Sequence, residues 1–190
     1  MSVRSHATWT VRGITRAMFP LLVVLSVVEV GSGLVLDTFE EQLIRYPSLL
    51  ILVPVMIGTA GNLGSILAAR LSTAFHLGTL SFDPTDDELA GNAVATVALA
   101  VTVFPLVGAG AWMLSLLTGG AQLFVGTVVA VALLSGFVLA VLAVVVTFVA
   151  TYAAYRFELD PDDVVIPVVT NTCDVLGVLI LFAVVRLFVS

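Results

Sequence analysis

Five long runs of apolar residues dominate this chain and restrict it to few folds. With approximate bounds, they lie at 17–36, 48–76, 90–117, 121–155 and 164–189. A helix needs about 20 apolar residues to cross the hydrocarbon core of a bilayer, and every run reaches that length. The gaps carry charges, Pro or Gly, and the gap "TGGAQ" is short enough to join two antiparallel helices directly. The sequence therefore predicts an all-α integral membrane protein with five transmembrane helices.

The composition supports the same interpretation. Hydrophobic residues make up 60% of the chain and charged residues only 11%, whereas a soluble domain is usually about a quarter charged. No stretch is long and polar enough for a soluble domain, so we expect residues 1–190 to form one membrane domain without a soluble regulatory domain. The first apolar run is not followed by a small-residue cleavage site, which indicates a retained helix and not a signal peptide.

The charges predict an orientation. The chain has seven arginines, no lysine and thirteen acids. An N-terminus inside would put five arginines on the cytoplasmic side and two outside, as the positive-inside rule prefers. We therefore expect a plasma-membrane protein with a cytoplasmic N-terminus and the C-terminus outside. The excess of acids without lysine is typical of halophilic organisms.

Two acidic loops would then face the cytoplasm. Their acids are candidates for attracting cations to an inner pore mouth. The alternatives are solvated loops and acids that favour the positive end of a helix. The candidate inner-mouth acids are Asp86, Asp87, Asp162 and Asp163.

Three polar residues in different predicted helices fall at similar depths. A rise of ~1.5 Å per residue puts Asn62 about 20 Å below the outer end of the second helix. The same rise puts Asp174 about 15 Å from the inner end of the fifth helix, and Glu29 about 18 Å into the first. An ionised carboxylate at the bilayer centre costs about 2.5–3.5 kcal/mol on insertion scales, so such acids face a cavity, a partner or an ion.

The fifth helix carries the best candidate metal ligands. Thr170, Asn171 and Asp174 share one helical stripe with Gly177, and their oxygens suit Mg²⁺, Ca²⁺ and Mn²⁺. The alternatives for Asp174 are a protonated carboxyl and a packing contact. Glu29 is open to three interpretations: a second pore acid, a proton-carrying group, or a buried protonated carboxyl.

The second predicted helix contains unusual residues for a membrane span. Pro54, Gly58, Gly61 and Gly64 predict a break in the helix, because Pro removes a backbone donor and Gly lets carbonyls turn outward. Irregular backbone at membrane depth is tolerated where it lines a cavity, so freed carbonyls and the Asn62 amide are predicted to line the same passage as Asp174. A small residue also recurs every fourth position from Gly61, which favours close helix packing.

These residues resemble a known family. Val53–Asn62 reads V-P-x-x-x-G-x-x-G-N and Ala69–Ala74 reads A-R-L-S-T-A, as in MgtE-type magnesium transporters and, more closely, the eukaryotic magnesium solute carriers of that superfamily. "ELAGNAVATV" resembles the start of the family's third helix, and Asp160–Pro167 resembles the lead-in to its fifth. The family's midplane magnesium-binding aspartate corresponds to Asp174.

The resemblance implies a five-helix cation-transporting domain that forms a homodimer with the pore on the dimer axis. Mg²⁺ would be the transported ion, and no organic cofactor, nucleic acid or enzyme activity is expected. MgtE proteins carry an N-terminal domain and CBS domains that gate the pore, but only about sixteen residues precede the first predicted helix here, so that gating is not expected within this chain. An exchanger coupled to H⁺ or Na⁺, transport of Mn²⁺ or Co²⁺, and a non-transporting membrane subunit remain alternatives.

Overall fold

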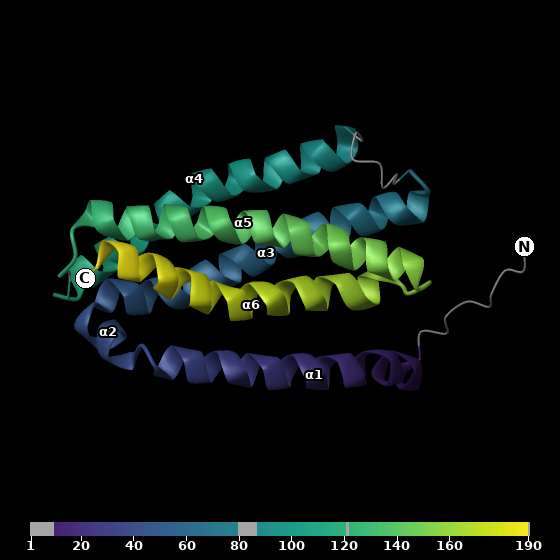
Figure 1. Cartoon of the computed structure of the whole chain (residues 1–190), viewed down its shortest axis with the longest axis horizontal. Helices are drawn as coiled ribbons and strands as arrows, with labels where there is room; N and C mark the ends of the chain where they lie inside the picture. The colour runs from purple at the N-terminus through teal and green to yellow at the C-terminus, as the bar shows by residue number, and fades with distance from the viewer. Residues whose placement is uncertain (1–9, 80–86, 121, 190) are drawn as a thin grey trace, which may run out of the picture.

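The computed structural model describes residues 10–79, 87–120 and 122–189 of the chain. All regular structure in these ranges is α-helical: α1 (Val11–Asp37), α2 (Glu40–Arg45), α3 (Pro47–Leu77), α4 (Asp87–Leu117), α5 (Val125–Arg156) and α6 (Pro161–Phe188). The five long helices run side by side along one axis (Figure 1). Short α2 lies at the end of the bundle, between α1 and α3.

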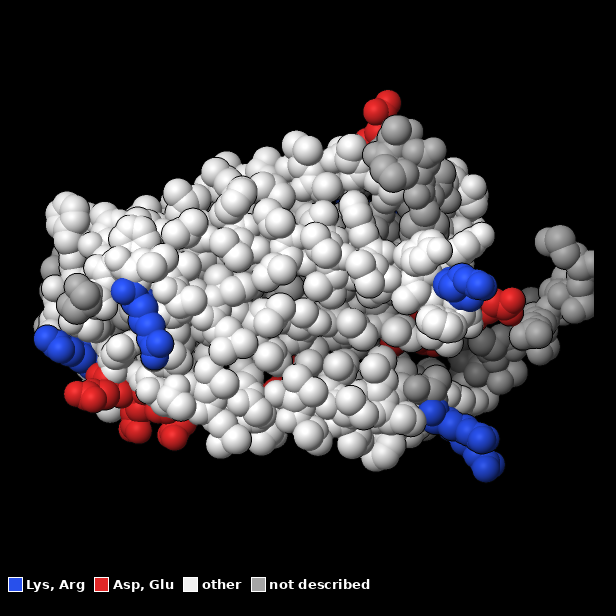
Figure 2. Space-filling view, in the orientation of Figure 1, with Lys and Arg blue, Asp and Glu red and all other residues white. Residues whose placement is uncertain are grey.

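Each long helix contains a segment that is long and apolar enough to cross a membrane. Figure 2 shows the charged side chains gathered towards the two ends of the molecule, with a broad and almost uncharged band between them. This distribution matches the apolar core of a bilayer between two aqueous faces. The prediction of a multi-pass membrane protein with five spanning helices is confirmed.

Four of the long helices form a packed block. α5 lies against α3, α4 and α6, and α3 also contacts α4 and α6, whereas α1 lies mainly along α6. The largest fully buried side chains of the block include Phe104, Leu139 and Phe182. On α1, by contrast, large apolar side chains such as Leu34 and Val27 are about 70% exposed. α1 is therefore the helix least covered by the rest of the chain.

Glycines set the closest helix contacts in this block. A Cβ on Gly108 of α4 would lie only 3.0 Å from the backbone Cα of Val129 on α5. A Cβ on Gly136 of α5 would overlap the buried ring of Phe104. Small residues at such positions let membrane helices approach closely, because dispersion contacts replace the hydrophobic effect as the driving force there.

The predicted break in the second long helix is wrong. α3 is one continuous α-helix from Pro47 to Leu77, and it passes through Pro54, Gly58 and Gly61 without interruption. Within a bilayer no water can bond a freed backbone group, so a helix that bonds its own backbone is favoured even where Pro and Gly occur. Freed carbonyls therefore do not contribute to an ion site on α3.

Two connections also differ from the predictions. The segment after α1 contains the short helix α2, which buries Leu43 and was expected to be a loop. α5 begins at Val125 and not near residue 121, which itself lies outside the described residues. Phe124 is extended before α5, and the Leu123 carbonyl accepts a hydrogen bond from Trp112 Nε1 at 3.0 Å. That bond holds the end of the connection against α4.

Candidate functional site

The side chain of Asn171 joins α6 to α1. It is only 5% exposed, and its Nδ2 donates to Glu29 Oε1 at 2.7 Å and to the Leu25 carbonyl at 3.1 Å. Glu29 itself is exposed in the single chain and is not a buried carboxyl. The Asn171 amide nitrogen is thus directed towards α1, and Glu29 lies level with the middle of α6.

Asp174, one turn further along α6, lies against α3. A Cβ on Gly61 would be 3.6 Å from Asp174 Oδ1, so the missing side chain of Gly61 leaves room beside the carboxylate. Asp174 is half-buried, and its carboxylate accepts no hydrogen bond from any residue in the described part of the chain. Glu29 contacts Asn171, which lies one turn before Asp174 on α6. Two acids and Gly61 therefore meet at one level of the bundle.

The hydroxyl of Thr170 has a local role. Its Oγ1 donates to the Ile166 carbonyl at 2.9 Å and to the Pro167 carbonyl at 3.1 Å, both within α6. Its Cγ2 methyl group faces Gly61, 3.8 Å from where a Cβ would be. Thr170 thus presents a methyl group to α3, whereas a ligand role would use the hydroxyl oxygen.

Asn62 follows Gly61 but lies on the outer face of α3. Its side chain is exposed and has no hydrogen-bond partner among the residues that the structure describes. Gly58 and Pro54, one and two turns earlier, are exposed on the same face. The single chain thus leaves a stripe of α3 uncovered, with one unpaired amide in its middle.

The fourth residue of the predicted helix break, Gly64, has the closest neighbours of the three glycines on α3. A Cβ there would overlap Val169 Cγ1 of α6 and would lie 3.6 Å from Ala143 Cβ of α5 and 3.7 Å from Cys173 Sγ. Gly64 therefore packs three helices together, and Cys173 is part of that buried contact.

Comparison with known protein families identifies the membrane block. Residues 53–184 match MgtE, described as a divalent cation transporter. The match extends from the first turns of α3 to the last turn of α6, and it covers more than half of the chain. This chain belongs to the MgtE family. MgtE is a transporter family, and divalent cations are its substrates.

The family-like segment Ala69–Ala74 of this MgtE chain contacts the start of α4. Arg70 Nε donates to Asn92 Oδ1, and Asn92 Nδ2 donates to the Glu88 carbonyl at 2.8 Å. Arg70 and the exposed Asp87 also line a cavity of about 310 Å³ between these helices. The hydrogen bond between Arg70 and Asn92 thus holds the start of α4 against α3.

The inner-mouth acids separate into different surroundings. Asp86 lies outside the described residues. Asp87 and Asp163 are exposed in the first turns of α4 and α6. Asp162 accepts a hydrogen bond from Ser72 Oγ at 2.6 Å, so of the three acids that the structure describes only Asp162 accepts a hydrogen bond from another helix.

Sequence reasoning missed two residues next to Asp162. His76 at the end of α3 and Asp160 at the start of α6 lie beside it. The D-P-D pattern pointed to a helix start, and Asp160 does cap α6 by accepting from Asp162 N at 3.0 Å. Nothing in the sequence pattern pairs His76 with a segment more than eighty residues away.

Proposed function

We propose that this MgtE-family chain transports Mg²⁺ across the plasma membrane and that Asp174 binds the ion within the bilayer. The observation that carries the proposal is a half-buried carboxylate in the middle of a spanning helix, with no hydrogen-bond donor in the described chain. A carboxylate in hydrocarbon is costly, and it persists there where it serves an ion or a partner.

The chemistry beside Asp174 favours a hydrated hard cation. Mg²⁺ gives up water reluctantly and is usually held by one or two carboxylates together with several waters. Gly61 leaves space next to the carboxylate, and the oxygens of Asn62, Asn171 and Thr170 complete the proposed set of ligands. Because the Thr170 hydroxyl donates within α6, its oxygen would act through a remaining lone pair.

We propose further that two copies of the chain enclose the pore. The α3 stripe of Pro54, Gly58 and Asn62 has no cover in the single chain, and an amide facing lipid is unfavourable. A second copy related by a two-fold axis would cover the same stripe on both chains. The axis would then pass between two Asn62 side chains, with the two Asp174 carboxylates behind Gly61 on either side.

The orientation belongs to the same proposal. With the N-terminus in the cytoplasm, the end of α3 and the starts of α4 and α6 face inward, since these helix ends share one end of the bundle (Figure 1). The excess of arginines at that side supports this direction. The lysine-free, acidic composition supports a halophilic source.

Exchange of the divalent ion for protons is a second candidate. Glu29 accepts a hydrogen bond from Asn171, which lies one turn before Asp174 on α6. As a second carboxylate near the middle of the bundle, Glu29 would carry a proton in this mechanism while Asp174 carries the ion. A channel has no need of such a group, so Glu29 is the residue that separates the two mechanisms.

The test is ion flux into proteoliposomes, with Mg²⁺ and pH indicators inside. We expect Asp174→Asn to reduce Mg²⁺ flux to the level of protein-free vesicles. The neutral amide lacks the negative charge that would compensate Mg²⁺ for water lost in the pore. Asp37→Asn is the matched control, since Asp37 makes the same chemical change at the exposed end of α1. Normal flux through folded Asp174→Asn would overturn the assignment of the ion site.

The same experiment decides between the alternatives. A proton signal that accompanies Mg²⁺ flux and disappears in Glu29→Gln would establish an exchanger. Mg²⁺ flux without a proton signal would favour a channel over an exchanger. A folded wild-type chain without flux of Mg²⁺, Mn²⁺ or Co²⁺ would contradict the proposed function and indicate a subunit that requires another chain.

A further inference from the structure

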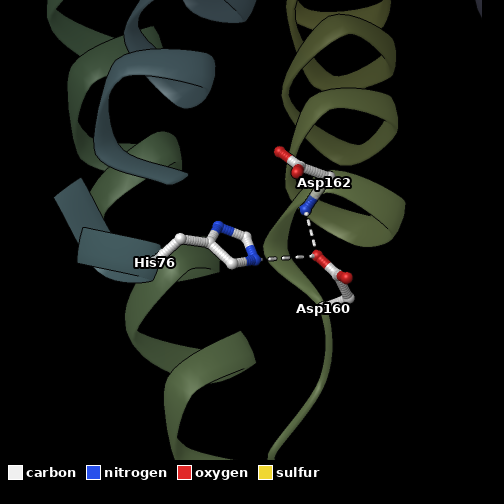
Figure 3. Close-up of side chains that lie close together, drawn as sticks. All are labelled: His76, Asp160 and Asp162. Atoms are coloured by element: carbon white, nitrogen blue, oxygen red, sulfur yellow. Dashed lines mark hydrogen bonds and ion pairs between the residues drawn. The ribbon is translucent and has the colours of Figure 1, made fainter. Parts of the chain in front are cut away.

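Three side chains with metal-ligating atoms meet where α3 ends and α6 begins. They are His76, Asp160 and Asp162, and their ligand atoms all lie within 4.8 Å of one another. Figure 3 shows the imidazole of His76 pointing from the end of α3 towards the two carboxylates at the start of α6. The cluster is remote from Asp174, which lies more than three helical turns further along α6.

The hydrogen bond of the imidazole leaves one nitrogen free for a metal. His76 Nδ1 lies 2.9 Å from the Ser72 carbonyl, an acceptor, so Nδ1 carries the proton. In the neutral ring Nε2 then has a lone pair, and it faces Asp160 Oδ1 at 3.8 Å. That separation exceeds hydrogen-bond length. Metal-binding histidines typically donate the second ring N–H to a backbone carbonyl in this way.

A buried hydroxyl positions the second carboxylate. Ser72 is only 2% exposed, and its Oγ donates to Asp162 Oδ1 at 2.6 Å. Ser72 thus holds Asp162 through its hydroxyl and His76 through its carbonyl. One residue on α3 therefore orients two of the three ligands, which is how outer-shell partners support a metal site.

We propose that His76, Asp160 and Asp162 bind a divalent transition-metal ion, of the class of Zn²⁺, Co²⁺ or Mn²⁺, in preference to Mg²⁺. Imidazole suits Zn²⁺ and its neighbours, whereas Mg²⁺ prefers an all-oxygen set with water. The proposal is independent of the transport function and concerns a different end of the molecule.

The dimensions fit such an ion after a small adjustment. Ligand atoms about 2.0–2.2 Å from a metal can be no more than about 4.4 Å apart. The observed spread of 4.8 Å therefore has to contract slightly. His76 and Asp160 have side chains that are 49% and 53% exposed, so both can turn towards an ion that enters from water. Water molecules would fill the remaining positions.

The experiment is Co²⁺ titration of the purified full chain, in detergent and without an affinity tag, while excess Mg²⁺ is present. Visible absorption reports a Co²⁺ ion bound to nitrogen and oxygen ligands. We expect one such ion per chain and a loss of affinity of at least roughly tenfold in His76→Ala and in Asp160→Asn. Asp163→Asn is the matched control, because it removes the same charge from the same helical turn without touching the cluster.

Two further variants distinguish a specific metal site from general attraction of Co²⁺ to acidic residues and from the proposed transport site. Ser72→Ala should weaken Co²⁺ binding although it removes no ligand, since the hydroxyl only positions Asp162. Asp174→Asn should bind Co²⁺ normally, so failure of the transport proposal would leave this result unchanged. Equal weakening in Asp163→Asn and Asp160→Asn would show general attraction to acids and overturn the site, as would full binding in folded His76→Ala.

Discussion

Replacing Gly64 with alanine tests how tightly α3 is held to the rest of the block. The added methyl group would overlap Val169 Cγ1 and would also touch Ala143 and Cys173. Val169 is fully buried, and a β-branched side chain in a helix has essentially one favourable rotamer. It cannot turn away, so α3 and α6 have to separate to admit the methyl group.

The magnitude follows from two opposing effects. Adding a methyl group to a well-packed core costs about 1–3 kcal/mol. Replacing glycine in a helix by alanine returns up to about 1 kcal/mol. We therefore expect the free energy of unfolding to fall by roughly 1 kcal/mol, which corresponds to a melting temperature lower by about 2–4 °C for a chain of this length.

The assay is thermal unfolding of the purified chain in detergent, with two other glycine variants as references. Gly110 in α4 has nothing within 4 Å of an added Cβ, so Gly110→Ala should melt at or above the wild-type temperature. Gly61→Ala meets Asp174 Oδ1 at an ordinary 3.6 Å and should also stay folded, but its methyl group should reduce Mg²⁺ flux. A Gly64→Ala chain that melts like Gly110→Ala would refute the close packing of α3 on α6.

Two further variants test polar and aromatic contacts. Arg70→Ala should lower the free energy of unfolding by about 1–3 kcal/mol, because the buried Asn92 loses the donor to its Oδ1; thermal unfolding measures this, and an unchanged melting temperature would show that the pair is dispensable. Phe39→Leu should cost about 0.5–1.5 kcal/mol, since the Phe39 ring stacks on Phe182 with centroids 3.8 Å apart under Arg186. A Phe39→Leu chain as stable as wild type would mean that apolar burial alone holds α2 to α6.

The long helices were predictable because the bilayer leaves a chain little choice. Continuous apolar runs can only satisfy their backbone as helices, so hydropathy located all five. The exact starts depended on capping chemistry instead. α6 begins at Pro161 because Asp160 accepts a hydrogen bond from Asp162 N and Pro suits the first helical position, three residues before the apolar run itself.

The same rule explains the failed prediction for α3. The prediction considered only the helix-breaking tendency of Pro54 and the glycines. In lipid, where no water can bond a freed backbone group, the cost of a broken helix outweighs that tendency. The glycines serve neighbouring helices and not a break, and Gly64 is the clearest case. Which glycine makes the closest contact depends on Val169, and no spacing within α3 carries that information.

The partners of the site residues could not be predicted, because they depend on contacts between helices that are distant in the sequence. A helical stripe placed Asn171 with Asp174, but the two side chains turn to different neighbours: Asn171 to Glu29 on α1, and Asp174 to Gly61 on α3. One helix reveals which residues share a face. It does not reveal which partner each of them meets, because that depends on how the helices are arranged around it.

The glycine contacts also have a mechanical consequence. Gly64, Gly108 and Gly136 let α3, α4, α5 and α6 pack in close contact, so separating these helices would break many packed contacts. Within the described residues, α1 contacts these helices mainly along α6, where Asn171 Nδ2 donates hydrogen bonds to Glu29 Oε1 and to the Leu25 carbonyl. If the chain changes conformation during transport, we therefore expect α1 to move relative to α3, α4, α5 and α6. Loss of the negative charge on Glu29 would weaken one of the two hydrogen bonds between α6 and α1, and the bond to the Leu25 carbonyl would remain.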